Sequence, residues 1–349
     1  MKSLKIVGTV FGSLIGIALL YLVRIILIPF KKIESVPVIV TNELELKQEI
    51  CDYRQNVSFV VDGDKIDAWL YMPEGMTEPV PCVILSNGFG GTKGLVLEEY
   101  AKRYREQGIA ALAYDFRTFG SSEGEPRQLF DIKMQHEDLA AAIMFAKNLE
   151  GIDSSKIILW GTSASGGYGL VQAAKDKEIA GVICQCPALD THADGEMALE
   201  RQGILFFLRL FIHAQRDKGR SRFGLSPHYV PITGEEESFA FINTKEAYEG
   251  YSSLISPTFV NKVCARSLFS ASNTNPKDFA KEVTCPVLLQ ICEFDNLVSE
   301  KSYKETAEIL GDYGKVIAYP CSHFEIYSGK HFENGVKDQI EFLLKINKV

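Results

Sequence analysis

Short runs of apolar residues recur along the chain from residue 81 onward, and longer segments with helical spacing separate the early ones. The apolar runs predict buried β-strands over 82–88, 109–116, 156–161, 179–187, 285–294 and 315–320. Residues 97–108 and 138–149 have the apolar spacing of amphipathic helices. Nearly continuous Val, Ile and Leu strands that alternate with helices predict an α/β fold, with a mostly parallel sheet covered by helices on both faces.

Two parts of the chain depart from this alternation. Residues 57–75 alternate apolar and polar side chains around an Asp-Gly-Asp turn, which predicts a β-hairpin and brings the sheet to about eight strands. Residues 188–283 interrupt the alternation and predict a helical insertion placed over the sheet as a cap. We expect four regions, which are an N-terminal membrane anchor (1–32), a core in two parts (33–187 and 284–349) and the cap insertion (188–283).

The insertion contains the apolar run "GILFFLRLFIHA" at 203–214. Three interpretations remain open for it. The run lines a hydrophobic substrate pocket, rests on a membrane, or forms the core of the cap itself.

The N-terminus is a long apolar segment. Ile6 to Val23 is 18 residues without a charge, and the apolar stretch continues past Arg24 to Phe30. At about 1.5 Å per residue this length crosses a hydrocarbon core of about 30 Å, which predicts a single transmembrane helix. The alternative is a cleaved signal peptide, although no small-x-small cleavage site follows the segment. Basic residues flank both ends, so the side of the membrane is not predicted.

Composition narrows the function classes. Only five of the 37 basic residues lie in residues 1–32, which have no acid, so the rest of the chain has 32 basic against 45 acidic residues. Such an acidic body repels phosphate backbones, and we expect no nucleic-acid partner. Most of the eight cysteines lie in or beside apolar runs, where buried reduced thiols are expected.

Chemistry is expected just beyond the strand ends, because ligands of parallel sheets bind at the carboxyl edge. The strand at 156–161 leads into "GTSASGG", which contains two serines. A nucleophile elbow needs a sharp strand-to-helix turn with small residues two positions before and after the nucleophile. Ser163 follows Gly161 and Ser165 precedes Gly167, so each serine has glycine in one of these two positions. The turn should come directly after the strand, which favours Ser163.

Two later strands end beside an acid and a histidine. Asp295 follows the strand at 285–294, and His323 follows the strand at 315–320. Glu293 and His331 are the competitors, but Glu293 lies within the strand and His331 is closer to the terminal helix. The order Ser163, Asp295, His323 is that of the α/β-hydrolase triad, so we expect the α/β-hydrolase fold and a serine nucleophile activated by a histidine that the acid orients.

A serine hydrolase also needs two backbone N–H groups that form an oxyanion hole. Ala164 follows the expected nucleophile, and Phe89 lies in the glycine-rich loop after the strand at 82–88. We expect these two residues to donate. Neither phosphate-loop nor dinucleotide-binding spacing of glycines is present, and no cofactor or metal is implied.

Five segments together resemble the α/β-hydrolase superfamily. They are "NGFGGTKG", "AYDFRTFGSSEGEPR", "DSSKIILWGTSASGGYGL", "CPVLLQICEFD" and "CSHFEIYSGKHFENGVKDQIEFL". The likeness is to the branch of polyketide transferase and thiohydrolase-like proteins, near the dienelactone hydrolases and acetyl xylan esterases, and it spans about residues 55–347. In this branch the matching positions imply Ser163 as nucleophile, Asp295 as acid and His323 as base. The chain departs from the branch at Thr118, where glycine is usual, and at Asn87, where histidine is common.

These observations predict a membrane-anchored serine hydrolase that cleaves a small-molecule ester or thioester of a hydrophobic acyl group through an acyl-enzyme. The same residues also suit an amidase or peptidase, because pocket contacts set that choice. A non-catalytic, membrane-tethered binding protein on the same fold is the alternative from another class.

Overall fold

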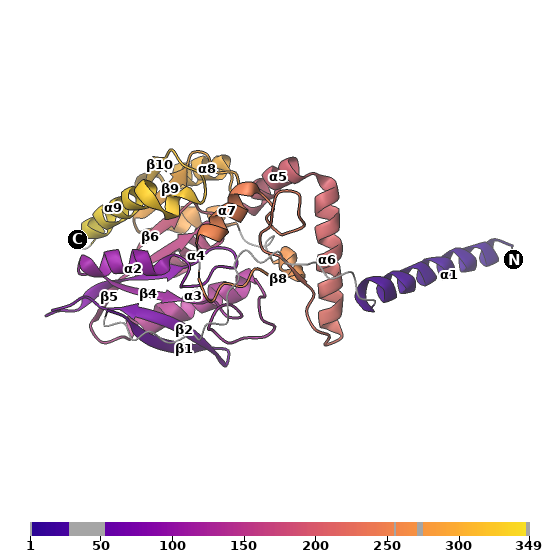
Figure 1. Cartoon of the computed structure of the whole chain (residues 1–349), viewed down its shortest axis with the longest axis horizontal. Helices are drawn as coiled ribbons and strands as arrows, with labels where there is room; N and C mark the ends of the chain where they lie inside the picture. The colour runs from indigo at the N-terminus through magenta and orange to yellow at the C-terminus, as the bar shows by residue number, and fades with distance from the viewer. Residues whose placement is uncertain (1, 28–52, 255, 271–274, 347–349) are drawn as a thin grey trace.

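A computed structural model describes residues 2–27, 53–254, 256–270 and 275–346. Its centre is one eight-stranded sheet in the order β1-β2-β4-β3-β5-β6-β9-β10, seen nearly edge-on in Figure 1. The strands are β1 Gln55–Val61, β2 Asp64–Tyr71, β3 Val80–Ser86, β4 Ala110–Tyr114, β5 Ile152–Thr162, β6 Ile179–Gln185, β9 Val287–Cys292 and β10 Gly314–Tyr319. Strand β2 runs antiparallel to β1 and β4, and the other neighbours are parallel. This confirms the predicted mostly parallel sheet.

Helices cover both faces because alternate side chains of the central strands point to opposite sides. Ile158 and Trp160 of β5 pack with α2 and α9, whereas Ile157 and Leu159 pack with α3, α4 and α8. The covering helices are α2 Leu97–Glu106, α3 Ile132–Lys147, α4 Tyr168–Lys175, α8 Glu300–Leu310 and α9 Gly329–Ile346. The sheet is therefore buried on both sides, and the carboxyl ends of its parallel strands meet at one edge.

The predicted hairpin is present at the start of the sheet. Asp62 and Gly63 connect β1 to β2 and both have positive φ, at 50° and 92°. Two consecutive residues with positive φ match the right-handed twist of the flanking strands, which explains why an Asp-Gly pair stands there.

The segment between β6 and β9 is mainly helical, as predicted. Its elements are α5 Thr191–Gln202, α6 Ile204–Arg222, β7 Tyr229–Val230, α7 Lys245–Ser253, β8 Val263–Cys264, η3 Ala265–Phe269 and η4 Pro276–Glu282. Strands β7 and β8 pair antiparallel. Each of these strands has only two residues, which are too few to show a period, so the sequence does not predict this pair.

The N-terminal segment forms α1 Lys2–Leu22, continued by one π-type turn, η1 Val23–Leu27. Within it, Gly8–Leu27 is long and apolar enough to cross a membrane, judged by length and composition. Helix α1 projects from the body beside α6 (Figure 1). Residues 28–32 of the predicted anchor, and Cys51, lie outside the described residues. The other seven cysteines are buried free thiols, as expected.

Candidate active site

Ser163 lies at the turn between β5 and α4. Its φ is +54°, a left-handed conformation that non-glycine residues seldom adopt. The turn is tight, since a Cβ added to Gly161 would collide with the carbonyl oxygen of Ser165. A strained serine on a strand-to-helix turn with glycine two residues earlier is the geometry of a nucleophile elbow.

Ser165 makes buried structural hydrogen bonds instead. Its Oγ donates to the carbonyl oxygen of Ser86 at 2.8 Å and accepts from the N–H of Thr162 at 3.2 Å. Its side chain thereby ties the short η2 helix (Ser163–Ser165) to the end of β3. The two serines therefore have different environments, and of the two it is Ser163 that contacts a histidine.

The structure brings all three residues of the predicted triad together. His323 Nε2 is 3.0 Å from Ser163 Oγ, and His323 Nδ1 is 2.6 Å from Asp295 Oδ2. The other carboxylate oxygen of Asp295 accepts the N–H groups of Leu297 and Val298 at 2.8 and 3.1 Å. The loop after β9 thus holds the carboxylate in one orientation toward the imidazole.

Charge and burial act in opposite directions on His323. Burial lowers the pKa of this imidazole, but the adjacent Asp295 carboxylate raises it, and the pKa lies above its ordinary value of 6.5. An imidazole whose protonated form is stabilised in this way is a stronger base toward a neighbouring hydroxyl.

The glycine-rich loop after β3 lies against Ser163. A Cβ added to Gly88 would approach the Ser163 Cβ to 3.0 Å, so glycine allows this close approach. Asn87 shapes the loop, because its Oδ1 accepts the Gly88 N–H at 2.7 Å and its Nδ2 donates to the Thr92 carbonyl at 2.6 Å. Phe89 comes next and lines the hollow beside Ser163, as does Ala164. The donor role of their N–H groups stays a prediction.

A buried ion pair fixes the far end of this loop. Lys93 is 1% exposed and Asp115 is fully buried. The Lys93 Nζ is 2.5 Å from Asp115 and 2.6 Å from Asp67. Asp115 also accepts the Lys93 N–H at 2.7 Å. The Lys93 ammonium is paired with two carboxylates inside the protein, so it is not available to bind a phosphate.

Comparisons with known proteins identify the family. The model of the family described as serine aminopeptidase, S33, matches residues 77–321. The chain belongs to this family of α/β-hydrolases. It is 36% identical over 294 residues to the quorum-quenching protein AidA of Acinetobacter baumannii. The aligned region covers 83% of this chain and 94% of AidA. It is 31% identical over 201 residues to the thiohydrolase aneE of Aspergillus aculeatus. This aligned region covers 56% of this chain and 62% of aneE.

A solved structure agrees with these relatives. DcsB in complex with its substrate analogue has a TM-score of 0.71 and 27% identity, covering 84% of this chain and 98% of DcsB. Polyketide transferases are also among the curated relatives, which confirms the branch that the sequence resembles. The protein is therefore an enzyme of the α/β-hydrolase class, and the alternative of a non-catalytic binding protein is set aside.

The hydrolase has an apolar hollow of about 270 Å³ next to Ser163. The core supplies one side of it, and α5, α6 and the loop before α7 supply the other. Its apolar lining includes Phe89, Phe130, Phe207, Leu210, Phe241 and Leu268. The polar exceptions include Asp194 and Arg201 of α5. A wall of this composition suits an apolar group of a small-molecule ligand.

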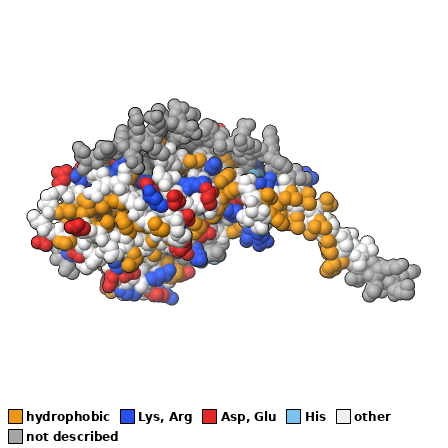
Figure 2. All heavy atoms as spheres, turned by 90° about the horizontal axis from the view of Figure 1, so that it is seen from below, with side chains coloured by type: hydrophobic (Ala, Val, Ile, Leu, Met, Phe, Trp, Pro, Cys, Tyr) orange, Lys and Arg blue, Asp and Glu red, His pale blue; other side chains and the backbone are white. Residues whose placement is uncertain are grey.

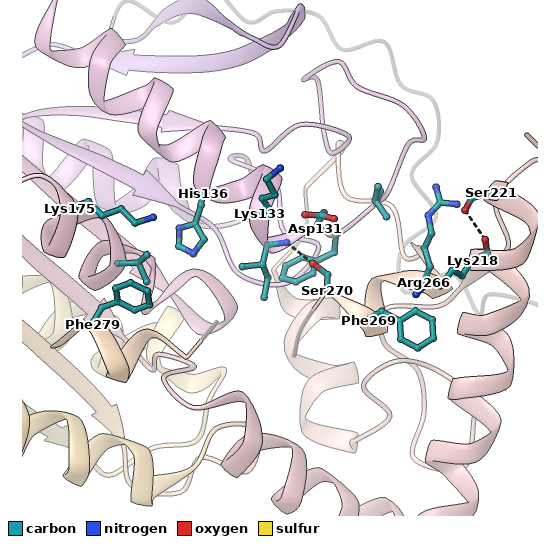
Figure 3. Close-up of a pocket in the computed structure, with 14 residues that line it drawn as sticks. Asp131, Lys133, His136, Lys175, Lys218, Ser221, Arg266, Phe269, Ser270 and Phe279 are labelled. Carbon is teal, nitrogen blue, oxygen red and sulfur yellow. Dashed lines mark hydrogen bonds between the residues drawn. The ribbon is translucent and has the colours of Figure 1, made fainter. Parts of the chain in front are cut away.

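A larger hollow of about 620 Å³ lies elsewhere, between α3 and α6, and none of the triad residues line it. Figure 3 shows Lys175 and His136 at one end and Lys218 and Arg266 at the other. The larger of these two hollows therefore lies away from the predicted triad. Within the described part of the chain, no group of three His, Cys, Asp or Glu side chains is placed to hold a metal ion.

Tyr251 of α7, in the insertion, is not among the site residues that the sequence predicts. Its hydroxyl donates to the carbonyl oxygen of Phe89 at 2.7 Å and so orients the peptide at the expected oxyanion hole. Its ring stacks on Phe259 and tilts against Phe324, the residue after His323. No strand end or motif marks this position, so only the folded insertion reveals it.

The unusual Thr118 keeps the backbone that a glycine would adopt. Its φ is +73° and the residue is fully buried. The Oγ1 of Thr118 donates to the carbonyl of Leu129 at 2.8 Å and accepts the N–H of the same residue at 3.1 Å. These two hydrogen bonds offset the strain of the left-handed conformation.

Proposed function

We propose that this hydrolase cleaves an ester or thioester of a hydrophobic acyl group, with Ser163 as nucleophile, His323 as general base and Asp295 as the acid that orients the imidazole. The observation that carries the proposal is the continuous contact from Asp295 through both ring nitrogens of His323 to Ser163 Oγ. Relatives named thiohydrolases support the choice of acyl transfer to water.

The reaction follows from these contacts. His323 Nε2 takes the Ser163 proton as Oγ attacks the carbonyl carbon, and the N–H groups of Phe89 and Ala164 hold the oxyanion. The tetrahedral intermediate collapses to an acyl-enzyme, and the leaving alcohol or thiol takes the proton from the imidazolium. Water then attacks the acyl-enzyme with His323 again as base, releasing the acid and restoring the serine.

Cleavage of an amide or peptide is the second candidate, because the matched family is described as a serine aminopeptidase. An aminopeptidase needs an anionic group for the substrate ammonium, and Asp194 lines the hollow. However, Asp194 already accepts the Ser299 N–H at 2.7 Å, and burial raises the pKa of its carboxyl to about 7. A carboxyl that is hydrogen-bonded within the protein and partly neutral at pH 7 favours an apolar acyl group over an ammonium.

We also propose that α1 is retained as a single-pass membrane anchor and that residues 188–283 act as the cap. The insertion holds the end of the anchor, because Arg216 Nη1 donates to the Ile25 carbonyl at 2.6 Å and Arg220 Nη1 to the Ile26 carbonyl at 3.1 Å. Cleavage as a signal peptide would remove these acceptors. Intact-mass measurement of the mature protein distinguishes the two cases, since an anchor leaves the full N-terminal segment in place.

The test of the triad is labelling with a fluorophosphonate probe, followed by mass spectrometry of the adduct. We expect an adduct on Ser163 in the wild type and none in Ser163→Ala, whose turnover of acyl esters falls by about 10⁴-fold or more. Ser165→Ala is the matched control. It should keep the adduct while losing about 1–3 kcal/mol of stability, because the Thr162 N–H and Ser86 carbonyl lose a buried partner.

An adduct on Ser165, or full turnover in Ser163→Ala, would overturn the assignment of the nucleophile. The substrate panel pairs each acyl group as ester, thioester and amide. It includes quorum-sensing signals, since one relative is named for quorum quenching. Faster turnover of amides than of matched esters would favour the peptidase alternative.

A further inference from the structure

Helix α6 carries a row of apolar side chains that face away from the protein. Leu205 is 79% exposed and Leu208 is 50% exposed. Ile204, Phe211 and Ile212 are exposed beside them. These residues recur at spacings of three, four and seven, so they form one stripe along the first half of the helix. We call these five residues the α6 stripe.

The opposite side of the same helix packs against the body of the protein and lines the hollow beside Ser163. Leu210 is 2% exposed and lines the hollow beside Ser163, together with Phe207. His213 and Ala214 are also buried. The stripe is therefore not needed to close the hollow, and an exposed row of this size on one helix indicates an interaction surface.

The end of the anchor packs on the same side of α6 as the stripe. A Cβ added to Gly219 would lie 2.6 Å from the Cδ1 of Ile26, so glycine gives this side chain its place. Gly219 is seven residues after Ile212 and eleven after Leu208, and these spacings keep all three on one face of a helix. Ile26 itself is buried there.

The relative directions of α1 and α6 indicate how α6 would lie against a membrane that α1 spans. Figure 1 shows α6 running across the end of the body, with α1 leaving that end crosswise to it. A spanning α1 would therefore hold α6 along the membrane surface, with the stripe on the side toward the lipid. Figure 2 shows apolar surface on α1 and on the adjoining end of the body, with basic side chains beside it.

The distribution of charge also favours a lipid membrane as the partner of the α6 stripe. The protein has a formal net charge of −8. In contrast, Ile204–Arg222 contains five basic residues and one acidic residue, with Lys218 and Arg222 exposed after the stripe. An apolar helix face followed by basic side chains matches the boundary between acyl chains and phosphate headgroups.

We propose that α6 is an interfacial helix, whose stripe inserts into the surface of the bilayer that α1 spans. The helix then lies between the lipid and the apolar hollow, one face toward each. This surface goes beyond the proposed hydrolysis, and it rests on retention of α1 in the membrane.

The test uses the full chain in vesicles of phosphatidylcholine and phosphatidylglycerol, with and without brominated acyl chains that quench tryptophan fluorescence on contact. Leu208→Trp reports on the stripe. Val60→Trp, exposed on the edge strand β1, is the control on a distant surface, and Leu14→Trp reports on α1. The signal of Trp69 and Trp160 is subtracted with the wild type. We expect quenching of Leu208→Trp to exceed that of Val60→Trp by at least about twofold.

A second pair of variants separates insertion of the stripe from folding of the enzyme. Ile212→Trp places a reporter seven residues after Leu205, on the same face of α6. Adding Leu205→Glu to this reporter introduces a charge into the stripe. We expect quenching at position 212 to fall toward the Val60→Trp level, while hydrolysis of a water-soluble short ester is unchanged. Equal quenching with and without Leu205→Glu would contradict insertion of the stripe.

The pattern of quenching distinguishes insertion of the α6 stripe from insertion of α1 alone. Quenching of Leu14→Trp without quenching of Leu208→Trp would overturn the proposal while leaving the anchor intact. No quenching at either position would overturn it because α1 is not in the bilayer. Absence of quenching by lipid at the stripe, together with crosslinks between the α6 stripes of two copies, would show that a second copy of this chain covers the surface instead.

Discussion

The sheet edge and the insertion above it contribute to the site in different ways. The sheet edge supplies Ser163, Asp295 and His323 from the loops after the parallel strands β5, β9 and β10. The insertion supplies much of the wall of the hollow and a hydroxyl that holds the loop after β3. The proposed catalytic residues therefore belong to the regular part of the fold, and much of the wall of the hollow belongs to the irregular part.

This difference suggests that changes at the sheet edge act on the rate for every substrate, whereas changes in the insertion act on the choice among substrates. Strand ends are fixed by the hydrogen bonds of eight paired strands, so a side chain there has little freedom to move. Helices α5 and α6 pack through side chains, and their positions adapt more readily to substitution.

Asp295→Asn is the strongest test on the sheet side after the nucleophile itself. The amide cannot stabilise the imidazolium, and it favours the wrong tautomer, so we expect kcat to fall by about 10⁴-fold for esters of every chain length. Steady-state assays with short and long acyl esters measure this. A loss confined to long acyl groups would contradict the division between the two regions.

The pH profile of the same pair sharpens this prediction. His323 acts as a base only when neutral, so kcat/KM of the wild type should rise with pH through a midpoint above 6.5, since Asp295 raises the pKa of the imidazole. In Asp295→Asn that charge is gone and burial dominates, so the midpoint should move to lower pH. The pH dependence of fluorophosphonate labelling gives both midpoints, and an unchanged midpoint would argue against the contact.

Tyr251→Phe tests the hydrogen bond by which the insertion holds the loop of the expected oxyanion hole. The change removes only the hydroxyl that holds the Phe89 carbonyl, while the ring keeps its contacts with Phe259 and Phe324. A less ordered oxyanion loop should lower kcat by about tenfold, with a smaller change in KM. Steady-state kinetics on one short acyl ester separates the two constants.

Tyr303→Phe is the matched control for that change. The Tyr303 hydroxyl is buried and has no hydrogen-bond partner among the described residues, so its removal should leave kcat unchanged. Equal effects of the two substitutions would mean that loss of a buried hydroxyl, rather than the bond to Phe89, causes the defect.

Much of the sheet edge could be predicted from the sequence because each of its elements has a local pattern. An apolar run marks a strand, and the residue after it lies at the edge where chemistry occurs. The distance from the end of the strand and the resemblance to the α/β-hydrolase branch both favour Ser163 over Ser165, and the contact with His323 agrees with them. The catalytic roles themselves stay predictions until the labelling experiment.

The contacts of the insertion could not be predicted, for a physical reason. Tyr251 and Phe89 are 162 residues apart, and no period or motif connects them. For the apolar run at 203–214, the sequence left a pocket wall, a membrane surface and a cap core as alternatives. A helix has two sides, and in α6 Leu210 lines the hollow whereas Leu205 is exposed. Hydrophobicity alone could not divide the run between them.

Leu210→Ala should have the smallest effect on rate and the clearest effect on selectivity. The truncation enlarges the hollow at a buried position of α6, so we expect turnover of longer acyl esters to gain about three- to tenfold relative to short ones. The lost packing should cost about 2–4 kcal/mol of stability. Leu208→Ala, on the exposed side of the same helix, is the control and should change neither quantity on water-soluble esters. If both variants shift the chain-length preference equally, α6 acts by moving as a whole, and the wall of the hollow would not be what selects the acyl chain.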